Sequence, residues 1–373
     1  MATIDPNEVA TKTERVQAFC VRHGLDGVWL QNRNNFSWIT CGRDNHIANS
    51  SHVGVTAIYA SKDGERICFA NSIEAPRMNT EELVGTGIEM IDFPWYDSAA
   101  AKKVIGDVLG GKKVAADTDT TGLGLQSLPG DFAQLRWSLT DAEILRYREG
   151  ARRTAAAIEA ACNQVQRGIT EHEIAAALSR EVHARGLIPT VNLVAADERI
   201  SRYRHPIPTN NRLARYVMIV CCAEFGGLIS NCTRFVHFGP MSDELKKKQQ
   251  AICDIDTAVN LATAPGRTLG EIFVDLQRAY AAQDASEQWK FHHQGGSTGY
   301  AGRESVANPT SNVKVVENQA FAWNPSITGV KNEDTVLCTA NGIEVLTAHS
   351  DQWPTVMGEY EGKSLRRAGM LVR

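Results

Sequence analysis

The chain has 373 residues, more than one typical hydrophobic core organises, so two domains are expected. Hydrophobic residues make up 43% and charged residues 22%, and the formal net charge of −4 speaks against a nucleic-acid-binding surface. No apolar run is long enough to span a membrane, and residues 1–5 lack the pattern of a signal peptide. Nine cysteines without a Cys-x-x-Cys pair favour reduced thiols and a cytoplasmic location.

The first part of the chain alternates helical and strand-like segments. Asp5 and Pro6 have the sequence of a helix start, and Gly24 that of its end. Strand-like runs follow at 27–30, 53–60, 67–70, 88–93 and 113–116, with helical stretches ending near 84 and spanning 98–109. This alternation predicts a small α/β domain over residues 1–138. It contains no Gly-x-Gly-x-x-Gly, so no dinucleotide or other cofactor is expected.

Long helices dominate the second part of the chain. They are predicted at 140–168, 170–186, 243–265 and from 268 onward, where Thr170 and Thr268 each have a glutamate three residues later, as in a capping box. Strand-like runs lie between and after them at 217–222, 233–238, 320–323 and 335–339. The pattern predicts an α+β domain with an antiparallel sheet over residues 139–373.

The segment 291–304 combines two histidines, four glycines and an Arg-Glu pair. Glycine lets the backbone approach a ligand closely, and histidine exchanges protons near neutral pH or binds metal. On an extended segment the neighbouring side chains of His292 and His293 would point to opposite faces, so only one is expected to act as a base.

Five short stretches together resemble one known family. They are Asn-Asn-Phe-Ser-Trp-Ile-Thr-Cys-Gly (34–42), Arg-His-Pro-Ile-Pro-Thr (204–209), Gly-Leu-Ile-Ser-Asn-Cys-Thr-Arg (227–234), Trp-Asn-Pro (323–325) and Asn-Glu-Asp-Thr-Val-Leu (332–337). In order and spacing the chain resembles the creatinase, prolidase and aminopeptidase P family. The resemblance implies an α/β N-terminal creatinase-like domain, a pita-bread C-terminal domain that carries the site, and a homodimer.

The metallopeptidases of that family bind two metal ions with Asp, Asp, His, Glu and Glu. The matching positions here hold Val220, Asn231, one of the two histidines, Asn324 and Glu333. Valine has no ligand atom and asparagine supplies only a neutral oxygen, whereas two divalent ions need several anionic oxygens. No metal is therefore expected, and a single weakly held ion bound by a histidine and Glu333 and completed by water stays open as an alternative. Creatinase is the family precedent for metal-free catalysis, and the chain shares its Gly-Arg-Glu at 302–304.

The resemblance and the residue types together assign roles. His292 or His293 is expected to move the proton, and the sequence leaves open which one. Glu333 is expected to hold that imidazole in one tautomer, or else only to form an ion pair with Arg303. Arg204 and Arg303 would bind a substrate carboxylate. The remaining expected substrate contacts are His205, Tyr300, the amide donors Asn231 and Asn324, and, contributed to the site of the partner subunit, Arg43, Asp44 and His46.

The sequence thus predicts a metal-independent, creatinase-like hydrolase that cleaves a C–N bond of a small carboxylate-bearing substrate. Three alternatives stay open: lyase or transfer chemistry, a non-catalytic pita-bread binding module, and a Xaa-Pro peptidase with an atypical metal site. Two nucleophiles are also considered, Ser297 in a Gly-x-Ser-x-Gly pattern and Cys232 beside a histidine.

Overall fold

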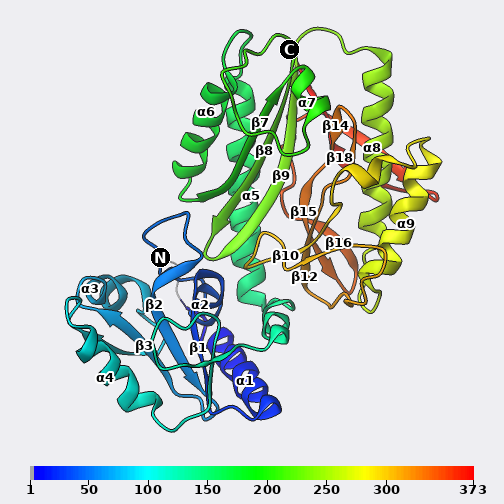
Figure 1. The fold of residues 1–373 in the computed structure, drawn as a ribbon. Coiled ribbons are helices and arrows are strands. Elements are labelled where there is room, and N and C mark those ends of the chain that lie inside the picture. Colours follow the sequence, from blue (N-terminus) through cyan, green and yellow to red (C-terminus); the bar gives the residue numbers. More distant parts are fainter. Residues whose placement is uncertain (1–3) are drawn as a thin grey trace. The chain divides into compact units, whose positions relative to one another are not determined.

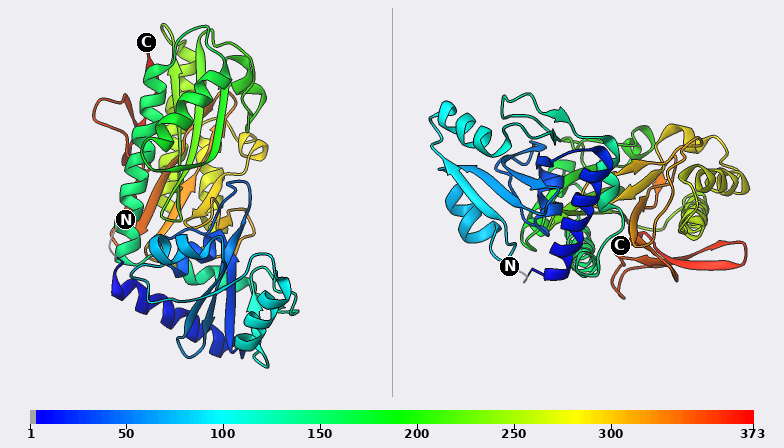
Figure 2. Two further views of the ribbon diagram at one scale, coloured as in Figure 1. Left: turned by 90° about the vertical axis from the view of Figure 1, so that its left-hand side faces the viewer. Right: turned by 90° about the horizontal axis from the view of Figure 1, so that it is seen from below.

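The computed structural model describes residues 4–373 (Figures 1 and 2). The chain divides into two compact units, Met1–Arg136 with Thr140–Glu143, and Trp137–Leu139 with Ile144–Arg373. We describe each unit by itself.

The N-terminal unit is built on a mixed sheet of strand order β4-β3-β2-β1-β5-β6. The strands are β1 (Gly27–Asn32), β2 (Val53–Ser61), β3 (Arg66–Asn71), β4 (Glu89–Phe93), β5 (Val114–Ala116) and β6 (Gln126–Ser127). The helices are α1 (Pro6–His23), α2 (Arg33–Ile39), α3 (Ala75–Arg77), η1 (Met78–Glu82), α4 (Ser98–Leu109) and η2 (Gly130–Arg136). Both ends of α1 follow the sequence signals: Asp5 caps the first turn, and Gly24 ends the helix at a φ of 61°.

The core of this unit forms on the sheet beneath α4. Trp29, Tyr59 and Phe69 come from three adjacent strands and are buried together with Ile105 and Leu109 of the helix. Burial of side chains of this size stabilises the fold by roughly 1.5–3 kcal/mol each. The apolar alternation in the strands therefore determines which face of the sheet the helix covers.

The C-terminal unit contains two larger sheets and two hairpins. One sheet has the order β19-β9-β8-β7 and the other β11-β10-β12-β15-β16, while β13 pairs with β14 and β17 with β18. The bounds are β7 (Ile188–Ala196), β8 (Tyr216–Phe225), β9 (Leu228–His237), β10 (Gly295–Thr298), β11 (Ser305–Val306), β12 (Gln319–Trp323), β13 (Ser326–Ile327), β14 (Val330–Lys331), β15 (Asp334–Thr339), β16 (Gly342–Val345), β17 (Thr355–Tyr360), β18 (Lys363–Ala368) and β19 (Leu371–Val372).

Long helices line these sheets (Figure 1). They are α5 (Asp141–Gln164), α6 (Glu171–His183), α8 (Asp243–Ala262) and α9 (Leu269–Ala282), and the short helices are α7 (Glu198–Arg202) and η3 (Gln288–Phe291). Strand β8 separates two hydrophobic clusters: Val217 and Ile219 face the cluster that includes α5 and α6, whereas Met218 and Val220 face the cluster that includes α8 and α9. Because side chains alternate between the two faces of a strand, successive residues of β8 pack in two different cores.

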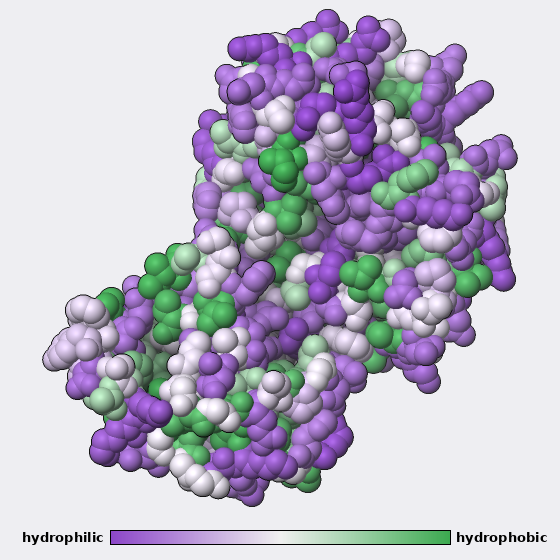
Figure 3. All heavy atoms as spheres, in the orientation of Figure 1, coloured by the Kyte–Doolittle hydropathy of each residue, from purple (hydrophilic) through white to green (hydrophobic). Residues whose placement is uncertain are grey.

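The predicted fold class is confirmed: an α/β unit precedes a pita-bread unit of mainly antiparallel sheets, in which β19 pairs in parallel with β9, lined by long helices. Figure 3 shows hydrophilic side chains prevailing on the visible face of the C-terminal unit, with apolar residues scattered among them. Between residues 4 and 373, none of the helices combines the length and apolar character that a membrane crossing requires.

Candidate active site

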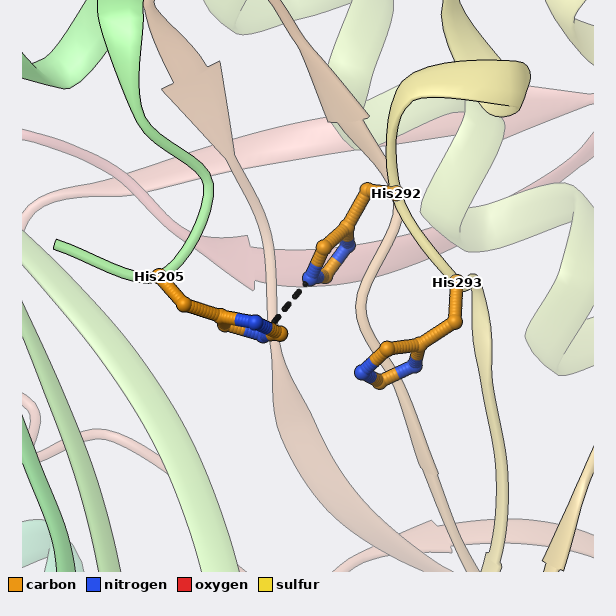
Figure 4. Close-up of side chains that lie close together, drawn as sticks. All are labelled: His205, His292 and His293. Carbon is orange, nitrogen blue, oxygen red and sulfur yellow. Dashed lines mark hydrogen bonds between the residues drawn. The ribbon is translucent and has the colours of Figure 1, made fainter.

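Three histidines of the C-terminal unit converge on one point (Figure 4). His205 lies in the loop after α7, and His292 and His293 lie in the loop between η3 and β10. The Nε2 atoms of His205 and His292 are 3.0 Å apart, so one of these nitrogens donates a hydrogen bond and the other accepts it. The rings of His292 and His293 stack with centroids 4.5 Å apart, and His293 lies 5.5 Å from His205.

The expectation that His292 and His293 point to opposite faces is wrong. Neighbouring side chains point to opposite faces in an extended strand. His292 and His293 are not in a strand, because both precede β10, which begins at Gly295. The side chain of His293 instead folds toward its own backbone, where its Nδ1 accepts a 3.3 Å hydrogen bond from the Gly295 amide. Both imidazoles therefore reach the same cluster.

The environment favours the neutral form of all three imidazoles. Burial, followed by the charge of Lys331, lowers the pKa of His292 to about 2. His293 and His205 are only partly desolvated: this partial desolvation and the nearby Arg303 lower the pKa of His293 to about 4, and partial desolvation with Lys331 also lowers that of His205. Because Nδ1 of His293 accepts from Gly295, the single proton of its neutral ring is on Nε2. The cluster thus holds both acceptor and donor nitrogens near neutral pH.

Glu333 lies beside this cluster but binds none of its rings. Lys331 Nζ lies 2.7 Å from its Oε2, Arg303 Nη2 lies 3.0 Å from its Oε1, and Thr233 donates a 2.8 Å hydrogen bond to Oε2. Within residues 4–373, the expected hydrogen bond from an imidazole to Glu333 is absent, so that sequence-based expectation is wrong. Burial alone would raise the pKa of Glu333, but Lys331 and Arg303 outweigh it and lower the pKa to about 2.

Lys331 is the site residue that the sequence reasoning missed. It is buried, and it precedes Glu333 by two residues. A lysine two positions from a glutamate in a strand-like run shares its face, and that spacing was the available signal. Lys331 lies just before the stretch 332–337 that carries the family resemblance, so the motifs did not indicate it.

The residues present do not fit the two-metal centre of the metallopeptidases. Val220 lies opposite Thr233 in the β8–β9 ladder and packs in the hydrophobic cluster of α8 and α9. Thr233 bonds to Glu333, so Val220 places a methyl surface on the strand face where the family has a carboxylate. Glu333 is already neutralised by two cations, and the other two positions hold amides. A dication pair would lack anionic ligands here.

Asn231 and Asn324 are both buried, and their amide donors are used within the protein. Asn231 Nδ2 donates to Thr298 Oγ1 over 3.2 Å, and Asn324 Nδ2 reaches Glu333 Oε1 over 3.5 Å. In the described chain, the Oδ1 atom of each has no hydrogen-bond partner. Both Oδ1 atoms are thus unpartnered acceptors that are shielded from solvent in this conformation, and the expected role of the two amides as oxyanion donors stays a prediction.

Arg204 borders a small pocket with His292 and Lys331. Apolar side chains complete its wall, namely Ile200, Met218, Ile327 and Val330. The Arg204 guanidinium donates to Thr328 Oγ1 over 3.0 Å and to Gln288 over 3.4 Å through Nη2, while its buried Nε has no partner among residues 4–373. One edge of the guanidinium thus remains for an acceptor such as a carboxylate oxygen.

The other residues expected to contact substrate are hydrogen-bonded or ion-paired within the protein. Tyr300 is buried, and its hydroxyl accepts a 2.8 Å hydrogen bond from Arg146. In the N-terminal unit, His46 Nδ1 lies 2.5 Å from Asp44 Oδ2, and the backbone carbonyl of Arg43 accepts from Ser37. These contacts give Tyr300 and Asp44 structural partners in this conformation.

Both alternative nucleophiles are excluded by their positions. Ser297 lies within strand β10 and is fully buried, whereas a nucleophile elbow requires an exposed turn between a strand and a helix. Cys232 is fully buried in β9, and burial raises the pKa of its thiol well above the ordinary range. All nine cysteines are free and buried.

Fold and site together define a pita-bread protein in which three histidines converge beside a buried glutamate. Residues 146–340, more than half of the chain, match the profile of metallopeptidase family M24. The chain belongs to this family.

Individual relatives are distant. The chain is 23% identical over 343 residues to an uncharacterized peptidase of Staphylococcus aureus strain MW2, covering 86% of this chain and 94% of the relative. Its fold is similar to that of the prolidase from Pyrococcus horikoshii, with a TM-score of 0.77 and 18% identity over 91% of this chain and 99% of the prolidase. It is also similar to the N-terminal domain of the FACT complex subunit SPT16 from chickpea, with a TM-score of 0.70 and 13% identity over 92% and 97% of the two chains.

Proposed function

We propose that the protein is a hydrolase that cleaves a C–N bond of a small, carboxylate-bearing substrate by histidine acid–base catalysis, independently of the two-metal centre of its family. The observation that carries this proposal is the convergence of His205, His292 and His293 beside a glutamate that two protein cations already neutralise. Water activation at such a site depends on nitrogen lone pairs, because the carboxylates that would hold the metal ions are missing.

The polar groups around the cluster support a substrate that carries a carboxylate and, next to the scissile bond, N–H groups. The Arg204 guanidinium beside the cluster would bind a carboxylate once the surrounding side chains open, because its pocket of about 10 Å³ holds about one water molecule in this conformation. The unpartnered oxygens of Asn231 and Asn324 would accept hydrogen bonds from N–H groups next to the scissile bond. Amide, amidine and guanidino compounds carry such groups, whereas a tertiary Xaa-Pro amide has no N–H at the bond itself.

In the proposed reaction the His205–His292 hydrogen bond opens, and a water oxygen forms a bond to the substrate carbon while a water proton passes to the Nε2 lone pair that is freed. The C–N bond then breaks, and the leaving nitrogen takes that proton from the resulting imidazolium, while Nε2–H of His293 donates a hydrogen bond to the oxygen that develops negative charge. All three histidines thereby return to their neutral forms, which balances the cycle. Each proton transfer of this kind contributes about 10²–10⁴-fold to a rate.

A substrate screen tests the proposal. Chelator-treated protein is incubated with small amides, amidines, guanidino acids and Xaa-Pro dipeptides, and release of ammonia, amine or amino acid is measured. Hydrolysis of an N–H-bearing, carboxylate-containing compound is the expected result. Turnover that appears only with Xaa-Pro dipeptides and added divalent metal would favour an atypical metallopeptidase instead.

The second candidate is a binding module without catalysis, which the replacement of acidic ligands by Val220, Asn231 and Asn324 favours. In that case the same pocket would bind a small carboxylate-containing ligand and release it without chemical change. Calorimetric binding of a compound from the screen, with no product after prolonged incubation, would establish this alternative.

We also propose that two chains form a homodimer and that Arg43, Asp44 and His46 of one subunit complete the site of the other. The support is the family resemblance together with the ordered Asp44–His46 pair, which fixes both side chains in one conformation. A chemically complete site would then require both subunits.

A further inference from the structure

The three histidines have the arrangement of a metal-binding cluster. One nitrogen from each ring can be chosen so that all three lie within 4.8 Å of one another. The closest pair, the Nε2 atoms of His205 and His292, is 3.0 Å apart. Nitrogen ligands of a tetrahedral zinc ion, with Zn–N bonds of about 2.0–2.1 Å, are separated by roughly 3.3 Å. Small side-chain rotations therefore suffice to bring three nitrogens around one ion (Figure 4).

This cluster differs from the metal centre of the family in its donors. Three imidazoles supply neutral nitrogen and no carboxylate, which suits Zn²⁺, Cu²⁺, Ni²⁺ and Co²⁺ and disfavours Mg²⁺, Ca²⁺ and Mn²⁺. Two of the rings are exposed and only His292 is buried, so an ion can enter from solvent. The fourth position of a three-histidine site would remain open for water or an anion.

The surroundings limit the affinity of the cluster. Lys331 and Arg303 both pair with Glu333, which leaves one net positive charge next to the site and repels a cation. Ligation through Nε2 of His293 would also disrupt its 3.3 Å hydrogen bond from Gly295. Nδ1 of His292 has no hydrogen-bond partner in the described part of the chain, although such a second contact usually orients a metal-binding histidine. Binding should therefore be reversible and sensitive to chelators.

We propose that His205, His292 and His293 form a mononuclear site for a first-row transition ion such as Zn²⁺ or Cu²⁺, and that an ion bound there inhibits the hydrolase. The binding part rests on the geometry of the cluster alone. The inhibitory part rests on the proposed function: a lone pair that ligates a metal ion no longer accepts a proton from water. The ion would thus act in the direction opposite to that of the metals in the family.

Metal binding is tested without substrate. The full-length protein is freed of metal with a chelator, dialysed, and titrated with Co²⁺ by absorption spectroscopy, Cu²⁺ by electron paramagnetic resonance and Zn²⁺ by calorimetry. One ion per chain and nitrogen hyperfine structure for Cu²⁺ are expected. Mg²⁺ serves as the control ion and should not compete.

Single variants identify the ligands. His205→Gln, His292→Gln and His293→Gln keep polar side chains of similar size, and each should weaken Zn²⁺ binding by roughly tenfold or more. His183→Gln, an exposed histidine of α6, is the matched control and should bind as the wild type does. Equal denaturation midpoints establish that the variants are folded. Absence of Co²⁺, Cu²⁺ and Zn²⁺ binding, or unchanged binding in folded variants of the cluster, would overturn the site.

The two proposals fail separately. If hydrolysis is found but the ions do not bind, or bind without slowing it, the metal inference or its inhibitory part falls and the proposed function stands. If the ions bind at the cluster but no substrate is hydrolysed, the metal site stands and the proposed function falls.

Discussion

Lys331 Nζ lies 2.7 Å from Glu333 Oε2, with both side chains buried on one side of the histidine cluster. The charge of Glu333 is balanced by an ammonium and a guanidinium that are built into the chain. The positive charge of the site is therefore permanent, whereas a bound metal ion can be removed.

Lys331→Met should destabilise the C-terminal unit. The substitution removes one partner of a buried ion pair, which typically costs ~3–5 kcal/mol, and Glu333 keeps Arg303 and Thr233, so a loss near the lower end is expected. Urea denaturation followed by circular dichroism measures it. Lys246→Met, which removes an exposed pair with Asp243, should change stability by less than about 1 kcal/mol. Equal losses in the two variants would contradict the buried pair.

The Glu333 carboxylate should make stability depend on acid pH. Its pKa is about 2 in the folded protein against an ordinary value of 4.5, so its stabilising contribution is present above pH 4.5 and is lost as the pH falls toward 2. The free energy of unfolding of the wild type should therefore approach that of Glu333→Gln on acidification, by about 1.4 kcal/mol per pH unit below 4.5. Urea midpoints of both proteins between about pH 3 and pH 6 measure this. A constant difference across that range would show that Glu333 is not held in its charged form.

Chelation should leave hydrolysis intact. Because Val220, Asn231 and Asn324 replace acidic ligands, the purified protein is expected to contain less than one tightly bound divalent ion per chain. Elemental analysis before and after EDTA treatment, combined with rates on a substrate from the screen, checks this. Loss of activity on chelation with recovery on adding Mn²⁺ or Zn²⁺ would contradict metal independence.

The histidine roles predict large and selective kinetic effects. His292→Gln removes one member of the pair that transfers the proton, and His293→Gln removes the Nε2–H that donates to the developing oxyanion, so each should lower kcat by roughly 10²–10⁴-fold with a smaller change in KM. His183→Gln should retain wild-type kinetics because it lies on α6. Wild-type turnover in either cluster variant would remove that residue from the mechanism.

The subunit arrangement predicts complementation between inactive chains. Asp44→Asn and His292→Gln should each be inactive alone, but an equal mixture refolded together should recover about one quarter of wild-type activity. Half of the dimers would then be mixed, and one of their two sites would combine an intact Asp44 with an intact His292. Sedimentation of the wild type should show a dimer. A fully active monomer, or a mixture without recovery, would place Asp44 outside the site.

The sequence by itself determined the fold class. Capping boxes at Thr170 and Thr268 act within one helical turn, and both are formed in the structure. The alternation of β8 side chains between two hydrophobic clusters likewise follows from strand geometry and requires no distant residue. The family resemblance could be inferred from the sequence because motif order and spacing are linear properties of the chain.

Only the tertiary structure decided which groups meet. His205 and His292 are separated by 87 positions, and their 3.0 Å contact depends on how two loops fold onto one site. The partner of Glu333 was misjudged for the same reason: burial makes its charge costly, and the structure compensates with Lys331 and Arg303 rather than with an imidazole. Local patterns specify elements, but the balance of charge and desolvation inside a site is set by side chains that the fold brings together.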